Sequence, residues 1–223
     1  MDYHVPLIAD NMYHILSHAT GSDDLFIEPN DYNSFLNRFD KYISPVADTF
    51  AYSLIPNHFH FQMQIKSYGQ LFDLRMQYKD AGFVKGGNDL IDLEGPGSLL
   101  AFEGGWQPKF VMQQFSNMLN GYAKYFNRKY DRKGSLFIDY MRRIEIKSDS
   151  QYTGTLFYIH KNPVHHGCCK EISDWKWSSY NTILSQSPTK IQRDKVIEWF
   201  GSVEKFIEYH AQPIYLKNAV VLE

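Results

Sequence analysis

Two histidines flank one large apolar residue in the segment 54–61, Leu-Ile-Pro-Asn-His-Phe-His-Phe. A Pro-Asn turn signal separates two runs, 49–55 and 59–65, that have the composition of β-strands. Because side chains alternate across a strand, His58 and His60 point to one face and the phenylalanine between them points to the other. The pair can therefore offer two imidazoles to one metal ion, although an isolated His-x-His is also found on ordinary, partly exposed strands.

A second pair of reactive side chains lies further along the chain, on a helix predicted to run from Ser148 or Asp149 to Asn162. Tyr158 and Asn162 are four residues apart and project from the same helix face. A tyrosine hydroxyl ionises only near pH 10 and is a poor nucleophile. Beside a divalent cation that stabilises the phenolate, it can attack the phosphorus of a phosphodiester. Asn162 offers a carbonyl oxygen to the same ion, and two imidazoles with one amide oxygen suit Mg²⁺ or Mn²⁺ better than structural zinc.

Composition narrows the class of protein. The chain has 223 residues, of which 43% are apolar and 16% aromatic, as expected of a globular protein with a sizeable core. Its formal charge of −2 gives no global attraction to nucleic acid or membrane, so any such affinity must be local. Cys168 and Cys169 are adjacent, which disfavours an intrachain disulfide between them. With neither a secretion signal nor a long apolar run, we expect a cytoplasmic protein with no membrane partner.

Hydrophobic periodicity indicates the elements that must position these side chains. A strand over 12–19, a helix from Pro29 to just before Pro45 and the two strands around the histidine pair give an opening order of strand, helix, strand, strand. The other predicted elements are a long helix over 109–130, a strand over 135–146, the helix that Pro163 stops, and two short helices within 196–210 on either side of Gly201.

Between the histidine strands and the long helix the composition changes. Eight of the fourteen glycines lie within residues 67–108, which we interpret as an irregular insertion. A phosphate-binding role is not indicated, because the segment lacks both Gly-x-Gly-x-x-Gly and Gly-Lys-Ser/Thr patterns. We therefore predict a domain over residues 1–185 that contains the insertion, followed by a helical extension over residues 186–223.

A local excess of positive charge lies between residues 124 and 147. Eight basic and three acidic residues give this stretch a charge of +5 in a chain of net −2. The pattern fits either a solvated face or a surface that contacts a phosphate backbone. The candidate DNA-binding residues are Lys124, Arg128, Lys129, Arg132, Lys133, Arg142 and Arg143.

Together these segments resemble the single-tyrosine HUH transposases, named for a His-hydrophobic-His motif, and in particular the branch that includes the REP-associated tyrosine transposases. The matching motifs occur in family order and cover most of residues 10–185. They are segment 54–61, Tyr-Phe-Asn-Arg-Lys-Tyr-Asp-Arg-Lys-Gly-Ser-Leu-Phe at 125–137, Tyr-Ile-His-Lys-Asn-Pro-Val-His-His-Gly at 158–167 and Trp-Lys-Trp-Ser-Ser-Tyr at 175–180. The resemblance implies an α+β fold: a ferredoxin-like or RRM-like antiparallel sheet with helices packed on it, the histidines on a central strand, and a C-terminal helical tail.

The resemblance also implies roles for individual residues. His58, His60 and Asn162 would bind the divalent cation, and Tyr158 would be the nucleophile. The implied activity is nicking and rejoining of single-stranded DNA at hairpin-containing sequences. A bond from the tyrosine to the 5′ phosphate would release a free 3′-OH, with no nucleotide cofactor.

One departure concerns DNA contacts. Many family members have a glutamine and an arginine-aromatic pair after Gly-Ser-Leu-Phe, where this chain has Ile-Asp-Tyr-Met at 138–141. The corresponding contact is either missing or moved to Arg142 and Arg143.

Several alternatives stay open. A replication-initiator or relaxase nickase would share the chemistry, although the single candidate tyrosine and the short chain favour a transposase. A domesticated hairpin-binding module without transposition is a second alternative. A zinc site within 165–169 lacks the usual ligand spacing, and His160 is expected to be structural. The sequence leaves open whether the protein is a monomer or a homodimer, and whether Tyr158 acts within its own subunit or across the dimer.

Overall fold

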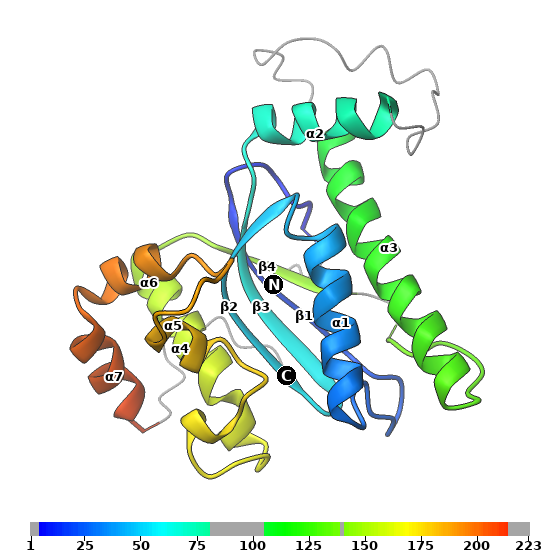
Figure 1. Cartoon of the computed structure of the whole chain (residues 1–223). Coiled ribbons are helices and arrows are strands. Elements are labelled where there is room, and N and C mark those ends of the chain that lie inside the picture. Colours follow the sequence, from blue (N-terminus) through cyan, green and yellow to red (C-terminus); the bar gives the residue numbers. More distant parts are fainter. Residues whose placement is uncertain (1–4, 81–104, 139–140, 214–223) are drawn as a thin grey trace.

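The structure, a computed structural model, describes residues 5–80, 105–138 and 141–213. It contains a four-stranded antiparallel sheet in the order β2-β3-β1-β4, so the histidine-bearing strand β3 is central (Figure 1). The predicted α+β, ferredoxin-like arrangement is confirmed. The strands are β1 (Met12–His18), β2 (Ala47–Ile55), β3 (His58–Ile65) and β4 (Arg142–Ile146).

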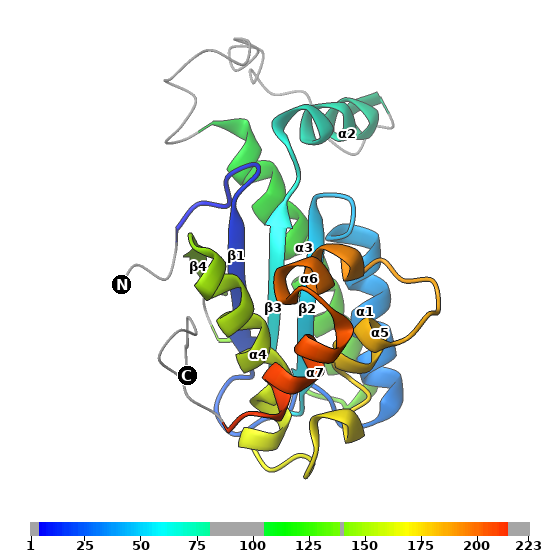
Figure 2. The ribbon, with the colours of Figure 1, turned by 90° about the vertical axis from the view of Figure 1, so that its left-hand side faces the viewer.

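Helices cover both faces of this sheet (Figures 1 and 2). Helices α1 (Pro29–Tyr42) and α3 (Trp106–Lys129) pack on one face, and α4 (Asp149–His165) packs on the other, against β2 and β3. The remaining helices are α2 (Tyr68–Asp80), which contacts α3, the 3-10 helix η3 (Ile172–Asp174), and α5 (Tyr180–Leu184), α6 (Arg193–Phe200) and α7 (Val203–Ala211) on the α4 side. None of the helices in the described part of the chain is long and apolar enough to cross a membrane.

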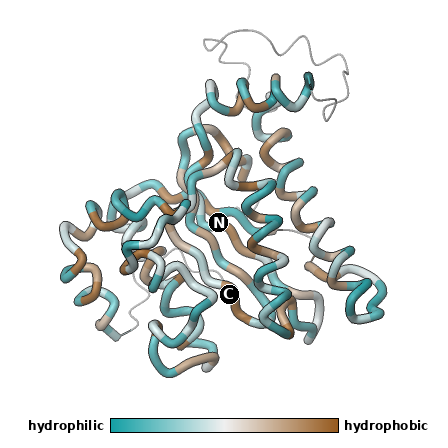
Figure 3. Tube along the Cα trace, in the orientation of Figure 1, coloured by the Kyte–Doolittle hydropathy of each residue, from teal (hydrophilic) through white to brown (hydrophobic). Residues whose placement is uncertain are grey.

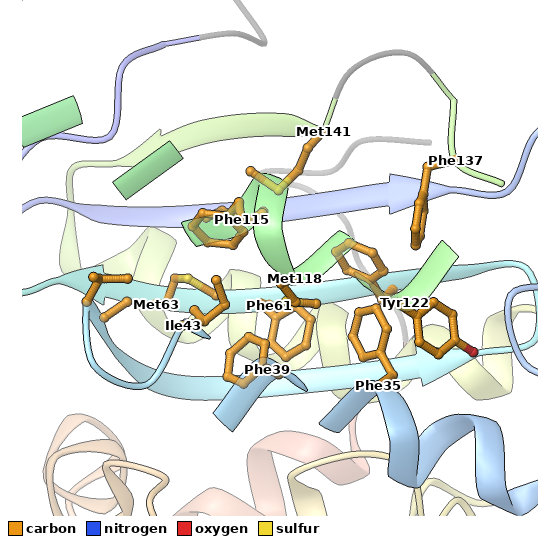
Figure 4. Packing of buried hydrophobic residues seen from close by; sticks show 14 of the residues in the cluster. Phe35, Phe39, Ile43, Phe61, Met63, Phe115, Met118, Tyr122, Phe137 and Met141 are labelled. Atoms are coloured by element: carbon orange, nitrogen blue, oxygen red, sulfur yellow. The ribbon is translucent and has the colours of Figure 1, made fainter. Parts of the chain in front are cut away.

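The alternation of side chains along β3 separates the main apolar core from the polar face. Phe59, Phe61 and Met63 face α1 and α3 and join the larger core, where each buried side chain contributes roughly 1.5–3 kcal/mol. Figure 3 shows apolar and polar positions alternating along α1 and α3, as expected of amphipathic helices. Their contribution to this core, seen in Figure 4, includes Phe35 and Phe39 from α1 and Phe115, Met118 and Tyr122 from α3.

Helix α4 begins where the sequence predicts but ends later. The side chain of Ser148 accepts a hydrogen bond from the backbone amide of Gln151, which caps the first turn. The predicted stop at Pro163 is wrong, because the helix continues to His165. Proline removes only one amide donor, and the next turn is kept by the hydrogen bond from the His166 amide to the Asn162 carbonyl oxygen.

The predicted strand over 135–146 is also shorter than expected. Among the described residues of this range, Arg142–Ile146 forms the strand that pairs with β1, while Phe137 forms an isolated bridge with Ala19. The side chain of Arg132 donates a hydrogen bond to the carbonyl oxygen of Ser135. This bond stabilises a loop conformation at the start of the predicted strand. Residues 139 and 140 lie outside the described residues.

The predicted irregular insertion over 67–108 contains regular structure at both ends. Helix α2 occupies Tyr68–Asp80, and α3 begins at Trp106 rather than at 109. The predicted insertion begins too early because its start was chosen from the glycine content of 67–108. Gly69 is the one glycine within α2, and the other glycines of this range follow residue 80. The rest of the proposed insertion, 81–104, lies outside the described residues.

Candidate active site

Strand β3 and helix α4 bring the four predicted site residues together. His58 and His60 project from β3 toward α4, and the Nε2 atom of His58 lies 3.1 Å from the Oδ1 atom of Asn162. The ring centroids of His60 and Tyr158 are 5.5 Å apart. The Nδ2 atom of Asn162 donates to the Tyr158 hydroxyl at 3.4 Å. A strand and a helix that are distant in sequence therefore form one compact polar cluster.

Two histidines that the sequence analysis did not assign to this site come from β1. The Nε2 atom of His14 lies 3.0 Å from the Nδ1 atom of His60. The His18 ring stacks on the His58 ring with centroids 4.4 Å apart, and these residues are directly opposite in the β1–β3 pairing. Their even spacing on a predicted strand puts His14 and His18 on one face, and this signal could have found them.

The cluster is closed to solvent except at one edge. His60 and Asn162 are fully buried, and His58 and Tyr158 are each 2% exposed. His166, just after α4, is exposed, and its ring centroid lies 4.7 Å from that of His58. The Tyr158 side chain is thus almost entirely covered by the surrounding residues.

Burial keeps the two β3 histidines neutral. Desolvation, reinforced by His18 and His166, lowers the pKa of His58 to about 3. Desolvation, reinforced by the neighbouring histidines with His14 first, also holds the pKa of His60 well below its usual range. Neutral imidazole is the form that binds metal, so both rings are in a ligand-competent state at pH 7.

The hydrogen-bond pattern around His58 fits a divalent cation. Its Nδ1 atom lies 2.9 Å from the Oδ1 atom of Asn57, and its Nε2 atom faces the Oδ1 atom of Asn162. A neutral imidazole has one N–H and can donate to only one of these two oxygens. A cation between Nε2 and Asn162 would satisfy the other pair, because adjacent ligands at about 2.1 Å from an octahedral ion are about 3 Å apart.

His60 supplies a second indication of a cation site. Its Nε2 atom is buried and has no hydrogen-bond partner among the described residues. Within the same part of the chain, no three His, Cys, Asp or Glu side chains are grouped to hold a metal ion. The residues that could hold a cation at this position are His58 and His60 with the amide oxygen of Asn162.

The predicted DNA-binding residues fall into two groups. Lys124, Arg128 and Lys133 are exposed. The others interact within the protein: Lys129 forms ion pairs with Glu28 and Asp31, Arg132 forms one with Asp23, and the Nε atom of Arg143 donates to the carbonyl oxygen of Val5. Arg142 is partly buried and also interacts within the protein.

The exposed cations at the end of α3 lie near the histidine end of the sheet. The segment after α3 is tied to the end of β1 by the hydrogen bond from the Thr20 amide to the Leu136 carbonyl oxygen. That end of β1 carries His18, opposite His58. The segment that contains Lys133 thus lies toward the end of the sheet that holds the candidate site.

Three tyrosines on and just after α3 bond to other parts of the protein and lie outside the candidate site. The hydroxyl of Tyr122 donates to the Leu25 carbonyl oxygen, and those of Tyr125 and Tyr130 donate to Asp31. Cys168 and Cys169 are free thiols.

His160 lies on the opposite side of α4 from the site. Its Nε2 atom lies 2.7 Å from the Ser179 hydroxyl, and its Nδ1 atom lies 3.0 Å from the Nε2 atom of His210 on α7. All three side chains are buried. The expectation that His160 is structural is therefore confirmed, and its contacts fasten α4 to the C-terminal helices.

Comparison with known proteins supports the fold. No protein-family model and no curated protein matches the sequence. The structure is similar to that of a REP-associated tyrosine transposase bound to a REP hairpin, with a TM-score of 0.52 and 15% sequence identity over 84% of this chain and 88% of that chain. The chain therefore has the fold of a tyrosine transposase, as the sequence resemblance implied.

Proposed function

We propose that this protein binds hairpin-containing single-stranded DNA and nicks and rejoins it by tyrosine transesterification. Tyr158 is the nucleophile, and His58, His60 and Asn162 hold Mg²⁺ or Mn²⁺. The observation that carries the proposal is the approach of α4 to β3, which places the tyrosine and the amide beside the two histidines. The shared fold with a transposase that binds a REP hairpin adds support for the DNA partner.

In the proposed reaction, the Tyr158 hydroxyl loses its proton and its oxygen attacks phosphorus. A bond from tyrosine to the 5′ phosphate forms as the bond from phosphorus to the 3′ oxygen breaks, and that oxygen takes up a proton to become a free 3′-OH. One phosphoester bond replaces another, so the reverse step rejoins the strand without a nucleotide cofactor. A bound cation would neutralise charge on the phosphate. The contact from Asn162 orients the hydroxyl.

The direct test uses single-stranded hairpins with randomised flanking sequence, incubated with the protein and Mn²⁺ or Mg²⁺. We expect a protein–DNA adduct that survives denaturation, retains a label placed 3′ of the cut, and does not form in EDTA. The released fragment should be extendable by a polymerase, because it ends in a 3′-OH. Adduct formation at full rate in EDTA would overturn the metal-dependent mechanism.

Removing either histidine should strongly reduce cleavage. We expect His58→Ala or His60→Ala to lower the rate of adduct formation at limiting Mn²⁺ by at least about 100-fold, since metal stabilisation of the transition state is worth several kcal/mol. Both side chains are buried, so melting temperature is measured alongside to separate lost chemistry from lost folding. Gln64→Ala, on the same strand but bonded through its side chain to the Asp10 carbonyl oxygen, is the matched control. Unchanged cleavage by both histidine variants would reject their role as ligands.

The exposed cations near the end of α3 should contribute salt-dependent DNA affinity. Replacing Lys124, Arg128 and Lys133 with alanine should flatten the log–log dependence of binding on salt by about 0.7–0.9 for every phosphate that these side chains bind. Arg132 is left intact, because its ion pair with Asp23 holds the loop after α3. Lys190→Ala, whose ion pair with Asp40 is exposed, provides a control. An equal slope for the triple variant and wild type would show that these cations form an ordinary solvated face.

The burial of Tyr158 favours one alternative function, a hairpin-binding protein that does not cleave. Its side chain is 2% exposed and belongs to an apolar cluster that includes Leu156 and Ile159. If the protein binds a hairpin tightly but gives no adduct with either metal, the binding-only function is the correct one.

A further inference from the structure

The two candidate ligand histidines are each held through the same ring atom. The Nδ1 atom of His58 lies 2.9 Å from the Oδ1 atom of Asn57, and the Nδ1 atom of His60 lies 3.0 Å from the Nε2 atom of His14. Asn57 immediately precedes β3, while His14 comes from the neighbouring strand β1. Each ring thus has a contact at its Nδ1 atom, and the two contacting residues come from different structural elements.

Each ring nitrogen of His58 faces a side-chain amide oxygen, which can only accept a hydrogen bond, and the neutral ring has one hydrogen to donate. The shorter of the two contacts, 2.9 Å against 3.1 Å, is the one from Nδ1 to Asn57, and it favours the hydrogen on Nδ1. In the neutral ring, Nε2 then carries a lone pair rather than a hydrogen. That lone pair is the one directed at the Oδ1 atom of Asn162, 3.1 Å away.

The surroundings of His60 favour the same assignment. Its Nε2 atom is buried with no hydrogen-bond partner among the described residues, so a hydrogen there would be an unsatisfied buried donor, which is unfavourable. A hydrogen on Nδ1 is instead donated to the Nε2 atom of His14. This arrangement requires the hydrogen of His14 to sit on its own Nδ1 atom. The unpaired lone pair on the Nε2 atom of His60 can be satisfied by a cation.

We propose that Asn57 and His14 are positioning residues that fix His58 and His60 in the tautomer with hydrogen on Nδ1. Both Nε2 lone pairs are thereby reserved for one cation, together with the oxygen of Asn162. The inference rests on the proposed metal site and deepens it, because it identifies what selects the ligand form of each ring. Outer partners of this kind typically change metal affinity by about 10–100-fold when they are removed.

The two positions should differ in the size of their effect. His14 is fully buried, and its ring lies 5.1 Å from that of His60 at an interplanar angle of 29°. Asn57 is exposed, so water can take over its acceptor role when it is removed. We expect the loss of Mn²⁺ affinity to approach about 100-fold for His14 and to stay near about tenfold for Asn57.

The experiment measures Mn²⁺ binding to the full-length protein without DNA, by electron paramagnetic resonance. His14→Phe keeps a ring beside His60 but cannot accept a hydrogen bond, and His14→Gln restores an acceptor. Asn57→Ala tests the second partner. Tyr13→Phe is the matched control, because this neighbour on β1 faces the other side of the sheet, and the change removes two hydrogen bonds, one to the Pro6 carbonyl oxygen and one from the Ile8 amide. Nitrogen-15 shifts of the imidazoles in the metal-free protein report the tautomers directly.

We expect weaker Mn²⁺ binding by His14→Phe and Asn57→Ala, partial recovery in His14→Gln, and no change in Tyr13→Phe. In the metal-free wild type, both His58 and His60 should carry hydrogen on Nδ1. Hydrogen on Nε2 of either ring, or wild-type Mn²⁺ affinity in a folded His14→Phe variant, would overturn the inference while leaving the proposed cleavage intact. Adduct formation without any metal would instead overturn the proposed function.

Discussion

Replacing Tyr158 with phenylalanine should abolish the covalent adduct and leave hairpin binding unchanged. The substitution removes only the hydroxyl oxygen, which is the proposed nucleophile, and keeps the ring in its apolar cluster and against His60. Because no other group can replace a missing nucleophile at the same position, we expect the adduct yield to fall by at least about 10³-fold. The measurement is a denaturing gel for the adduct, paired with equilibrium binding of the same hairpin.

Tyr152 provides the matched control for this experiment. It lies on the same helix, but its ring stacks on Trp199 rather than approaching the histidines. Tyr152→Phe should therefore retain adduct formation. Peptide mapping of the wild-type adduct should identify the peptide that contains Tyr158, and attachment to any other tyrosine would disprove its role.

Replacing Asp31 with asparagine should cause the largest loss of stability among the substitutions considered. Its carboxylate is fully buried and accepts hydrogen bonds from the side chains of Lys129, Tyr125 and Tyr130 and from two backbone amides. Removing one partner of a buried ion pair costs about 3–5 kcal/mol, and the partial exposure of Lys129 places this site at the lower end. Urea unfolding monitored by circular dichroism measures the change.

An exposed ion pair provides the comparison. Asp40 pairs with Lys190, and both side chains are more than half exposed. Asp40→Asn should therefore change the free energy of unfolding by less than about 1 kcal/mol. Equal effects of the two substitutions would contradict the view that the Asp31 network holds the start of α1 against the end of α3.

The contribution of Asp31 should also depend on pH. Burial alone would raise the pKa of this carboxyl, but the hydrogen bonds from Lys129, the Glu28 amide, Tyr130 and the Ile27 amide outweigh it, and the pKa is lowered below 3.8. A lowered folded-state pKa gives stability that is fully present above the unfolded value near 3.9 and is lost as pH falls through the folded value. The difference in unfolding free energy between wild type and Asp31→Asn should thus be constant from pH 7 to 5 and shrink below pH 4. A difference that persists undiminished at the lowest pH where both proteins fold would argue against this assignment.

The sequence predicts those parts of the site that depend on local periodicity. Alternation along one strand is enough to place His58 and His60 on the same face, and helical spacing is enough to align Tyr158 with Asn162. The approach of the helix to the strand is a tertiary contact, and the sequence indicated it only through the family resemblance.

Local spacing can place His14 and His18 on one face of their strand, but it cannot show which residues of another strand they meet. The register of β1 against β3 brings His14 to His60 and His18 to His58, and no local pattern contains that register. The basic stretch presents the same difficulty. Its composition predicts a surface charge, but Lys129 and Arg132 are paired with acidic residues about a hundred positions earlier in the chain.

The candidate site is built from strand β3 and helix α4, and these two elements are held in the protein in different ways. Strand β3 is paired on both sides, whereas α4 contacts the sheet with one face and is fastened on its other face by Ser179 and by His210 of α7. Parts of a protein open with free energies that range from near zero to that of global unfolding. Amide hydrogens of β3 should therefore exchange with deuterium only on global unfolding, while those of α4 exchange through a smaller opening that releases α6 and α7. Such an opening would uncover Tyr158 while the histidines on β1 and β3 stay in place, so the contacts between α4 and the C-terminal helices would determine how often the proposed nucleophile is accessible.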